Sequence, residues 1–400
     1  MEMTRKRSGL AIIFFTVFID LVGFGVIIPL LPFYAEHFNA SPDAVTLLMA
    51  IYSLTQFFFA PFWGRLSDRI GRKPVLMISL LGIAVAYVGV GFSQTLWELF
   101  LARAAAGAMA GNIAAAQAYI SDVTPPEKRA HGMGLIGAAF GLGFILGPAI
   151  GGILGGSDPT QPNFLAPALT AAALSLAACL FALAMLKESH RPEAGALEPR
   201  RGRFQILQQA LTSPGLQRLV ILFFLVTFVF SGMESVFALW SERAFGWGAT
   251  QNGYVFAYTG LVAAAVQGGL IRRLRKRFGE PALILQGAAV LLIGFVLIPL
   301  SHSLPILLVA MACLAYGASL CSPSLSSLIS LRAAGNSRGS MLGVSQSAAS
   351  LARILGPAAA GALFTIGGRN LPFLAGGAVV ALVLLVALGL RRASEASSGA

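Results

Sequence analysis

Twelve apolar runs, each long enough to cross a bilayer, occupy most of this 400-residue chain. A helix needs about 20 apolar residues to span the hydrocarbon core of a membrane. Only 11% of the residues are charged, against about 25% in a soluble domain. The sequence therefore predicts an all-α membrane protein with twelve transmembrane helices. The runs cover 9–33, 44–63, 75–94, 96–121, 132–156, 164–186, 219–240, 250–271, 281–301, 304–330, 339–367 and 371–390.

The 28 Lys and Arg residues are distributed unequally over the predicted loops. With the N-terminus inside, 24 of them lie on cytoplasmic segments and two, Arg243 and Arg369, lie on outer loops. Basic loops stay on the cytoplasmic side, so we expect both termini in the cytoplasm. The large excess of Arg over Lys and the lack of a eukaryotic sorting signal favour a bacterial inner (plasma) membrane. The same loops account for the net charge of +12 without nucleic acid as a partner, and we expect them to contact anionic lipid headgroups.

A charged segment that contains prolines, 187–218, separates two groups of six runs. We interpret 1–186 as an N-terminal six-helix bundle, 187–218 as a cytoplasmic linker and 219–400 as a C-terminal six-helix bundle. The two groups match at an offset of 208 or 209 residues, with Leu66–Gly71 on Leu274–Gly279 and Gly147-Pro148 on Gly356-Pro357. Two like-oriented repeats around a central cavity are the architecture of an alternating-access transporter.

The predicted loop between spans two and three carries an eleven-residue motif, Gly64-Arg65-Leu66-Ser67-Asp68-Arg69-Ile70-Gly71-Arg72-Lys73-Pro74. With the twelve runs and the repeat, this motif resembles the major facilitator superfamily over the whole chain. The resemblance implies a cytoplasmic gate in which Asp68 latches onto the start of span eleven, where a helix N-terminus stabilises a carboxylate. It also implies an acidic partner for Arg72, for which Asp122 is the candidate. The predicted gate residues are Gly64, Asp68, Arg69, Gly71, Arg72 and Asp122.

Span five contains closely spaced glycines and a proline. They resemble the G-x-x-x-G-P-x-x-G-G motif of the drug:proton antiporter branch, which implies export. Small residues four positions apart let helix backbones touch, and a proline kinks its helix, so this span is expected to prevent leakage and to act as a pivot. The residues are Gly143, Gly147, Pro148, Gly151 and Gly152.

Three further stretches, Asp20–Pro29, Ala118–Thr124 and Lys187–His190, resemble the tetracycline-efflux-like group with twelve spans. That group carries additional acids in spans three and nine. At those places this chain has Ala84–Tyr87 and Ala288–Leu291, without an acid. The resemblance therefore implies the group but leaves tetracycline in doubt as the substrate.

Four ionisable residues, Asp20, Arg103, Glu234 and Arg353, lie near the middle of predicted spans. A charge there costs about 2.5–3.5 kcal/mol, so each must face a cavity or another charge. The helical rise puts one acid and one base of each half at similar depths, which favours the pairs Asp20–Arg103 and Glu234–Arg353. We expect the two acids to couple transport to protons, with the two arginines as partners. The alternative is a pair of permanent structural ion pairs.

The helix faces around these residues are small or aromatic and offer few polar anchors, which suits amphiphilic cargo. The predicted cavity residues are Phe24, Gln117, Thr227 and Phe230. The sequence contains no P-loop for ATP, no catalytic constellation and no His or Cys at metal spacing, so we expect no enzyme and no cofactor.

The sequence thus predicts a monomeric secondary transporter that exports small organic, drug-like compounds, antibiotics among them, in exchange for protons by alternating access. Proton symport or facilitated diffusion of a small metabolite is an alternative in the same fold. A non-transporting membrane receptor or scaffold is an alternative from another class.

Overall fold

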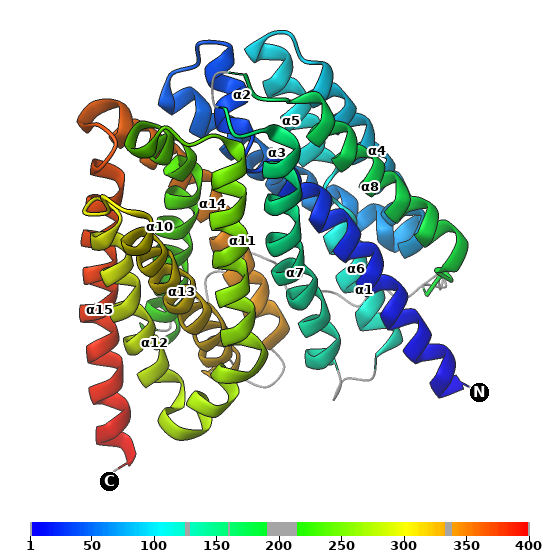
Figure 1. The fold of residues 1–400 in the computed structure, drawn as a ribbon. Coiled ribbons are helices and arrows are strands. Elements are labelled where there is room, and N and C mark those ends of the chain that lie inside the picture. Colours follow the sequence, from blue (N-terminus) through cyan, green and yellow to red (C-terminus); the bar gives the residue numbers. More distant parts are fainter. Residues whose placement is uncertain (1, 125–128, 159–160, 190–213, 333–337, 399–400) are drawn as a thin grey trace. The chain divides into compact units, whose positions relative to one another are not determined.

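The computed structural model describes residues 2–124, 129–158, 161–189, 214–332 and 338–398, and this part of the chain contains helices and no β-strand (Figure 1). Ten of its helical segments are long and apolar enough to cross a membrane. One of them, Ala249–Leu297, is 49 residues long and contains the non-helical Gly279, so it covers the predicted spans eight and nine. A shorter apolar segment, Gly141–Gly155, lies in the predicted span five. The predicted all-α membrane fold is confirmed, and the count of helices is consistent with twelve spans.

The chain divides into two compact units. The first contains Met1–Ala196 together with Ser241–Gly260. In this unit α1 lies along α7 and α8, α4 lies along α8, and α3 lies along α5. Its helices are α1 (Glu2–Ile27), α2 (Leu31–His37), α3 (Pro42–Ile70), α4 (Arg72–Phe92), α5 (Leu96–Met109), α6 (Asn112–Val123), α7 (Arg129–Gly155) and α8 (Leu165–Met185).

The second unit contains Leu197–Trp240 and Leu261–Ala400. Within it α12 lies along α13 and α15. The helices after the linker are α10 (Pro214–Phe245), α11 (Ala249–Ala265), the π-helical turn η2 (Val266–Leu270), α12 (Ile271–Leu297), α13 (Leu304–Arg332), α14 (Arg338–Gly367) and α15 (Leu371–Ser398). The C-terminal end of α10 and the first turns of α11 therefore belong to the first unit. Most of the predicted linker lies outside the described residues, and the division at 187–218 stays a prediction.

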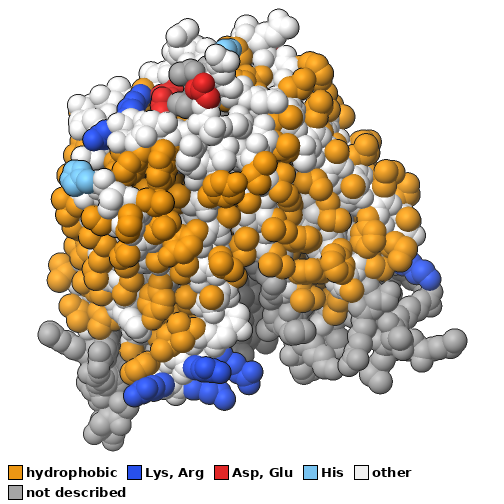
Figure 2. Space-filling model, in the orientation of Figure 1, with side chains coloured by type: hydrophobic (Ala, Val, Ile, Leu, Met, Phe, Trp, Pro, Cys, Tyr) orange, Lys and Arg blue, Asp and Glu red, His pale blue; other side chains and the backbone are white. Residues whose placement is uncertain are grey.

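The outer surface of the helices is apolar, as a lipid environment requires. Hydrophobic side chains cover most of the face seen in Figure 2, and a group of Lys and Arg side chains lies at the end where α12 begins. Large apolar side chains such as Val85, Leu261 and Leu385 are exposed. In a soluble protein an apolar surface of this extent would cause association, whereas in a bilayer it faces hydrocarbon.

Two predicted spans are broken. The first is interrupted after Ile27 and resumes as α2 at Leu31, because Pro29 has no N–H group and disfavours a helical conformation at the residue before it. Span four, predicted as one helix over 96–121, is divided into α5 and α6 at Ala110 and Gly111.

Candidate functional site

The break in span four is made by a side chain from another helix. The Ser79 hydroxyl of α4 donates to the Met109 carbonyl and accepts hydrogen bonds from the backbone N–H groups of Gly111 (2.9 Å) and Asn112 (2.8 Å). An inserted side chain that takes over backbone hydrogen bonds is a known cause of a sharp kink. The Trp63 indole, whose Nε1 donates to the Ala108 carbonyl at 2.6 Å, supports the same turn. As a result, Asn112 begins a new helix.

Asp20 of α1 is held beside this break. Its side chain is 5% exposed. One carboxylate oxygen, Oδ2, accepts a hydrogen bond from the Asn112 side-chain amide, and the other, Oδ1, accepts one from the Ser175 hydroxyl at 2.9 Å. The acid therefore joins α1, α6 and α8 through two neutral donors. A buried carboxylate that is hydrogen-bonded in this way avoids most of the cost of an unpaired buried charge.

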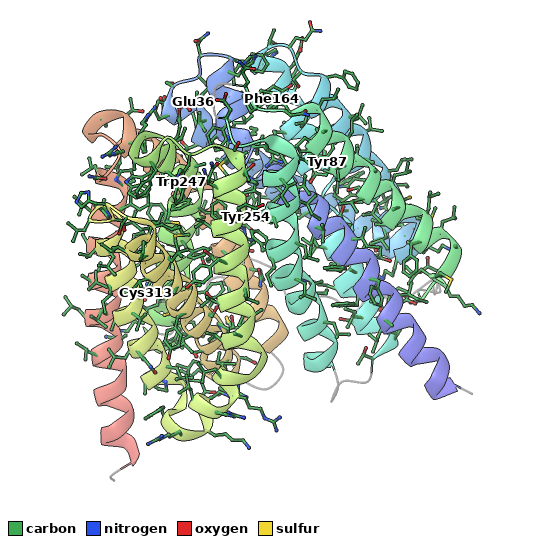
Figure 3. The ribbon with its side chains drawn as sticks, viewed as in Figure 1. Glu36, Tyr87, Phe164, Trp247, Tyr254 and Cys313 are labelled. Carbon is green, nitrogen blue, oxygen red and sulfur yellow. The ribbon has the colours of Figure 1, made fainter. Side chains whose placement is uncertain are left out.

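Arg103 of α5 is also buried, with 3% of its surface exposed. Its Cζ lies 4.8 Å from the centre of the Tyr52 ring on α3. In the described part of the chain, its Nε and Nη1 make no hydrogen bond. Tyr87 of α4, which Figure 3 shows among the helices of this unit, interacts electrostatically with it. A cation–π contact stabilises a desolvated guanidinium by about 2 kcal/mol but satisfies none of its N–H donors.

In the described residues Asp20 and Arg103 are not in direct contact: the carboxylate accepts from Asn112 and Ser175, and Arg103 Nε and Nη1 make no hydrogen bond, so the predicted pairing stays a prediction. Depth along a helix says nothing about the direction in which a side chain points. Span four is also not one straight helix, because the break at Ala110 and Gly111 lies between Arg103 and the helix that carries Asn112.

The other predicted pair lies in the second unit. Arg353 of α14 interacts electrostatically with Glu234, a half-buried residue of α10. The two helices are in close contact beside it, since the Ser231 hydroxyl donates to the Ala352 carbonyl at 3.2 Å. A methyl group at Gly232 would lie 3.0 Å from the Gly356 carbonyl oxygen. The structure thus brings Glu234 and Arg353 together where α10 and α14 touch.

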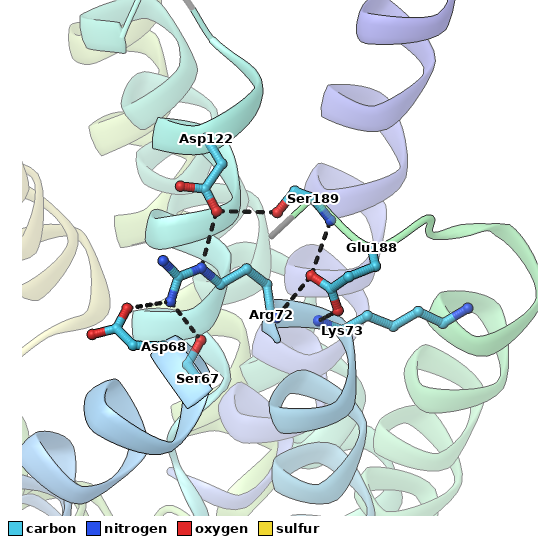
Figure 4. Close-up of polar contacts among 7 residues, drawn as sticks. All are labelled: Ser67, Asp68, Arg72, Lys73, Asp122, Glu188 and Ser189. Carbon is cyan, nitrogen blue, oxygen red and sulfur yellow. Dashed lines mark hydrogen bonds and ion pairs between the residues drawn. The ribbon is translucent and has the colours of Figure 1, made fainter. Parts of the chain in front are cut away.

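The predicted gate loop is an ordered network around Arg72, which is 8% exposed. Its Nε donates to Asp122 Oδ2 at 2.9 Å, and its Nη1 donates to Asp68 Oδ1 at 2.6 Å and to Ser67 Oγ at 3.1 Å (Figure 4). The predicted contact between Arg72 and Asp122 is present. Asp68 pairs with Arg72 inside this unit, and its role as a latch on span eleven stays a prediction.

Glu188, which follows α8, caps the N-terminus of α4. Its carboxylate accepts hydrogen bonds from the backbone N–H groups of Arg72 (2.9 Å) and Lys73 (3.0 Å). This contact satisfies free donors of the helix and places a negative charge at its positive end. Gly71, which precedes α4, has φ = 102°, a conformation that favours glycine, and Gly279 has φ = 76° at the equivalent place in the second repeat. Gly64 has open space around it, and Arg69 is exposed.

The glycines of α7 let this helix touch two others. A Cβ atom at Gly143 would lie 2.9 Å from the Leu21 Cβ, and one at Gly147 would lie 2.6 Å from the Gly25 Cα, both on α1. A Cβ atom at Gly151 would overlap the Val26 carbonyl of the same helix.

The other side of α7 faces α11. A Cβ atom at Gly152 would lie 2.7 Å from the Ala249 carbonyl oxygen, and one at Gly253 would overlap the Pro148 carbonyl. Backbone contact on both sides leaves no space between these helices, which fits the expected role of the motif in preventing leakage.

The predicted cavity residues differ in their surroundings. The Phe24 ring lies 5.1 Å from that of Tyr52 and 6.1 Å from that of Phe144. Gln117 is exposed, and Phe230 is half-buried. The Thr227 hydroxyl donates to the Phe223 carbonyl of its own helix at 2.8 Å. These placements leave the cavity assignments as predictions.

Sequence reasoning missed Asn112, Ser175 and Tyr52. Each is a small polar or aromatic residue in an apolar run and gives no signal of its own. The sequence also gives no sign of the ion pair that Arg243, on a predicted outer loop, forms with Glu36 at 3.2 Å. Figure 3 shows Glu36 at one end of the first unit.

Comparison with known proteins places the chain in a family. A family model described as Major Facilitator Superfamily matches residues 13–353 and 270–400. The chain is 32% identical to the class C tetracycline resistance protein of Escherichia coli over 98% of this chain and 100% of that protein. It is 27% identical to major facilitator superfamily domain-containing protein 10 of Mus musculus over 98% of this chain and 95% of that one.

Among solved structures, the human organic anion transporter MFSD10 (TETRAN) matches with a TM-score of 0.72 and 25% identity, covering 96% of this chain and 99% of that one. The nucleoside transporter NupG matches in fold, with a TM-score of 0.74 and 14% identity, covering 95% of this chain and 98% of that one. The family match over nearly the whole chain agrees with the helices, the glycine contacts of α7 and the Arg72 network. This chain belongs to the major facilitator superfamily and is a secondary active transporter of small molecules.

Proposed function

We propose that the chain exports small organic, drug-like compounds from a bacterial cytoplasm in exchange for protons, with Asp20 and Glu234 as the groups that take up and release them. The protein works as a monomer in the inner membrane with both termini in the cytoplasm. Its two six-helix halves, 1–186 and 219–400, alternate between facing states. The relatives that are tetracycline resistance proteins support the class of cargo.

The hydrogen bonding of Asp20 is the observation that carries this proposal. A hydroxyl group can donate to a carboxylate or accept from a carboxylic acid. Ser175 can therefore satisfy Asp20 in both states, while Asn112 continues to donate to the other oxygen. A permanent ion pair with an arginine would hold the acid in its charged form. The neutral partners thus favour proton exchange at Asp20 over a fixed structural ion pair, whereas at Glu234, which interacts with Arg353, exchange requires that cargo displaces the arginine.

The break in span four offers a route from the proton to the helices. Asn112 binds Asp20 with its side chain and Ser79 with its backbone. Loss of the negative charge on Asp20 weakens its hydrogen bond with the Asn112 amide, because hydrogen bonds to charged groups are stronger than neutral ones. Protonation is thereby expected to loosen α6 from α1 and to favour one facing state over the other.

Everted membrane vesicles test the proposal. With a preformed acidic interior, addition of a carried compound from a fluorescent panel that includes tetracycline is expected to release protons from the wild-type vesicles. The Asp20→Asn and Glu234→Gln variants are expected to insert but to lose this response. Asp43→Asn, the same chemical change in the first turn of α3, is the matched control and keeps it. Proton movement in the opposite direction indicates symport. Transport without proton movement indicates a facilitator, and the absence of transport for every compound indicates a scaffold; each of these results overturns the proposal.

A further inference from the structure

Arg103 is a buried cation that has no acid as a direct partner in the described residues. Its guanidinium is 3% exposed, and two of its nitrogens make no hydrogen bond within the described residues. Burial of a charged group is tolerated when the group is paired and hydrogen-bonded. The buried acid of the same unit, Asp20, is bonded to Asn112 and Ser175. A buried arginine with unused donors requires an acceptor, and the side chains of the described residues do not supply one.

The aromatic ring of Tyr52 on α3 lies against Arg103, and two further rings continue from it. The Tyr52 ring lies against the guanidinium, with Cζ 4.8 Å from the ring centre. The Phe24 ring is 5.1 Å from Tyr52, and Phe144 of α7 continues the cluster at 6.1 Å from Phe24. All of these residues belong to the first unit. The guanidinium therefore lies at the edge of an apolar aromatic surface.

The backbone of Tyr52 is held closely against α5. One turn after Arg103, α5 touches α3 at Gly107, where a Cβ atom would overlap both the Tyr52 carbonyl and the Thr55 hydroxyl. Such close contact between backbones leaves α3 little freedom to slide along α5. The two helices that carry the ring and the guanidinium are thus held in register before any ligand binds, which lowers the cost of ordering the site.

We propose that Arg103, Tyr52 and Phe24 form a binding subsite for an organic anion, in which Arg103 binds a carboxylate and the rings contact an aromatic group of the same molecule. A guanidinium matches a carboxylate in geometry and charge better than any neutral acceptor does. The subsite rests on the proposed function, because it specifies the class of cargo as compounds that combine a negative charge with a flat apolar part.

Binding of three probes to the purified full-length protein tests this subsite by titration calorimetry at constant ionic strength. The probes are 2-naphthoate, its neutral analogue 2-naphthamide, and cyclohexanecarboxylate. Wild type is expected to bind naphthoate at least about tenfold more tightly than naphthamide, since one hydrogen bond between charged groups suffices for that ratio. Arg103→Gln is expected to abolish the preference, and Tyr52→Leu to weaken naphthoate more than cyclohexanecarboxylate. Arg332→Gln, at an exposed arginine on α13, keeps the wild-type ratio.

The subsite is overturned if wild type binds naphthoate and naphthamide equally, or if Arg103→Gln leaves the ratio of the two affinities unchanged. It is also overturned if chloride displaces naphthoate equally well from wild type and from Tyr52→Leu, because that result indicates a site for inorganic anions. If Arg103→Gln does not fold, Arg103→Lys keeps the charge without the planar donors and is expected to reduce the ratio. The vesicle assay is independent of these titrations. Proton-coupled export with no preference for anions contradicts only the subsite, and anion binding without proton movement contradicts only the proposed function.

Discussion

At the scale of the residue, the partners of each buried charge decide what that charge can do. Asp20 has two neutral donors and can exist with or without its proton, while Arg103 has an aromatic ring and unused N–H groups. Arg72 has three acceptors on two helices. The first arrangement suits exchange, the second suits binding, and the third suits a fixed junction, although all three residues lie in otherwise apolar helices.

Replacement of Arg72 by lysine tests the junction. A lysine ammonium cannot reach Asp122 and Asp68 together in the planar geometry that Arg72 uses. Because both acids are partly exposed, we expect Arg72→Lys to lower the free energy of unfolding by only about 1–3 kcal/mol and to reduce transport. Thermal unfolding of the purified protein measures the first effect. Arg332→Lys is the control and is expected to change the stability by less than about 0.5 kcal/mol; an equal loss in both variants contradicts the role of the network.

At the scale of the element, the glycines of α7 allow this helix to pack closely against α1. The absence of side chains at Gly143, Gly147 and Gly151 lets the α1 backbone lie directly against it. The second repeat has an equivalent contact, because a Cβ atom at Gly356 of α14 would overlap the Phe228 carbonyl of α10. Each unit therefore contains a pair of helices in backbone contact beside its acid, Asp20 or Glu234.

A pair of alanine substitutions in α7 separates this contact from helix propensity. At Gly151 the new methyl group would overlap the Val26 carbonyl, whereas at Gly141 nothing lies within 4 Å. We expect Gly151→Ala to lower the free energy of unfolding by at least about 1–3 kcal/mol, because backbone atoms cannot move aside as a side chain can. Gly141→Ala is expected to be neutral or slightly stabilising, since alanine favours the helix. Thermal unfolding of the two variants in one detergent measures the difference, and similar midpoints would refute close packing at Gly151.

At the scale of the whole molecule, the distribution of basic residues predicts which ends of the helices lie in the cytoplasm. Cysteine labelling checks it after the three buried or half-buried native cysteines, Cys179, Cys313 and Cys321, are replaced by alanine. Ser303→Cys, just before α13, is expected to react with a membrane-impermeant thiol reagent in intact cells. Lys276→Cys, in the basic segment of α12, is expected to react only after permeabilisation. Both positions are exposed, so the reverse pattern would show that the orientation, and with it the direction of export, is wrong.

The amino-acid sequence by itself determined the helical spans, the internal repeat and the family. It also indicated Asp20, Arg72 and Asp122 as candidate site residues. These follow from hydropathy, charge and spacing, which are local properties that a bilayer or a short motif selects directly. Only the tertiary structure decided the partners of those residues. Asn112 and Ser175 are 92 and 155 positions from Asp20, and span four breaks because Ser79, on a different helix, takes over its backbone hydrogen bonds. Contacts between distant helices depend on how each helix is rotated and packed, and an apolar sequence without a period of polar residues does not specify that rotation.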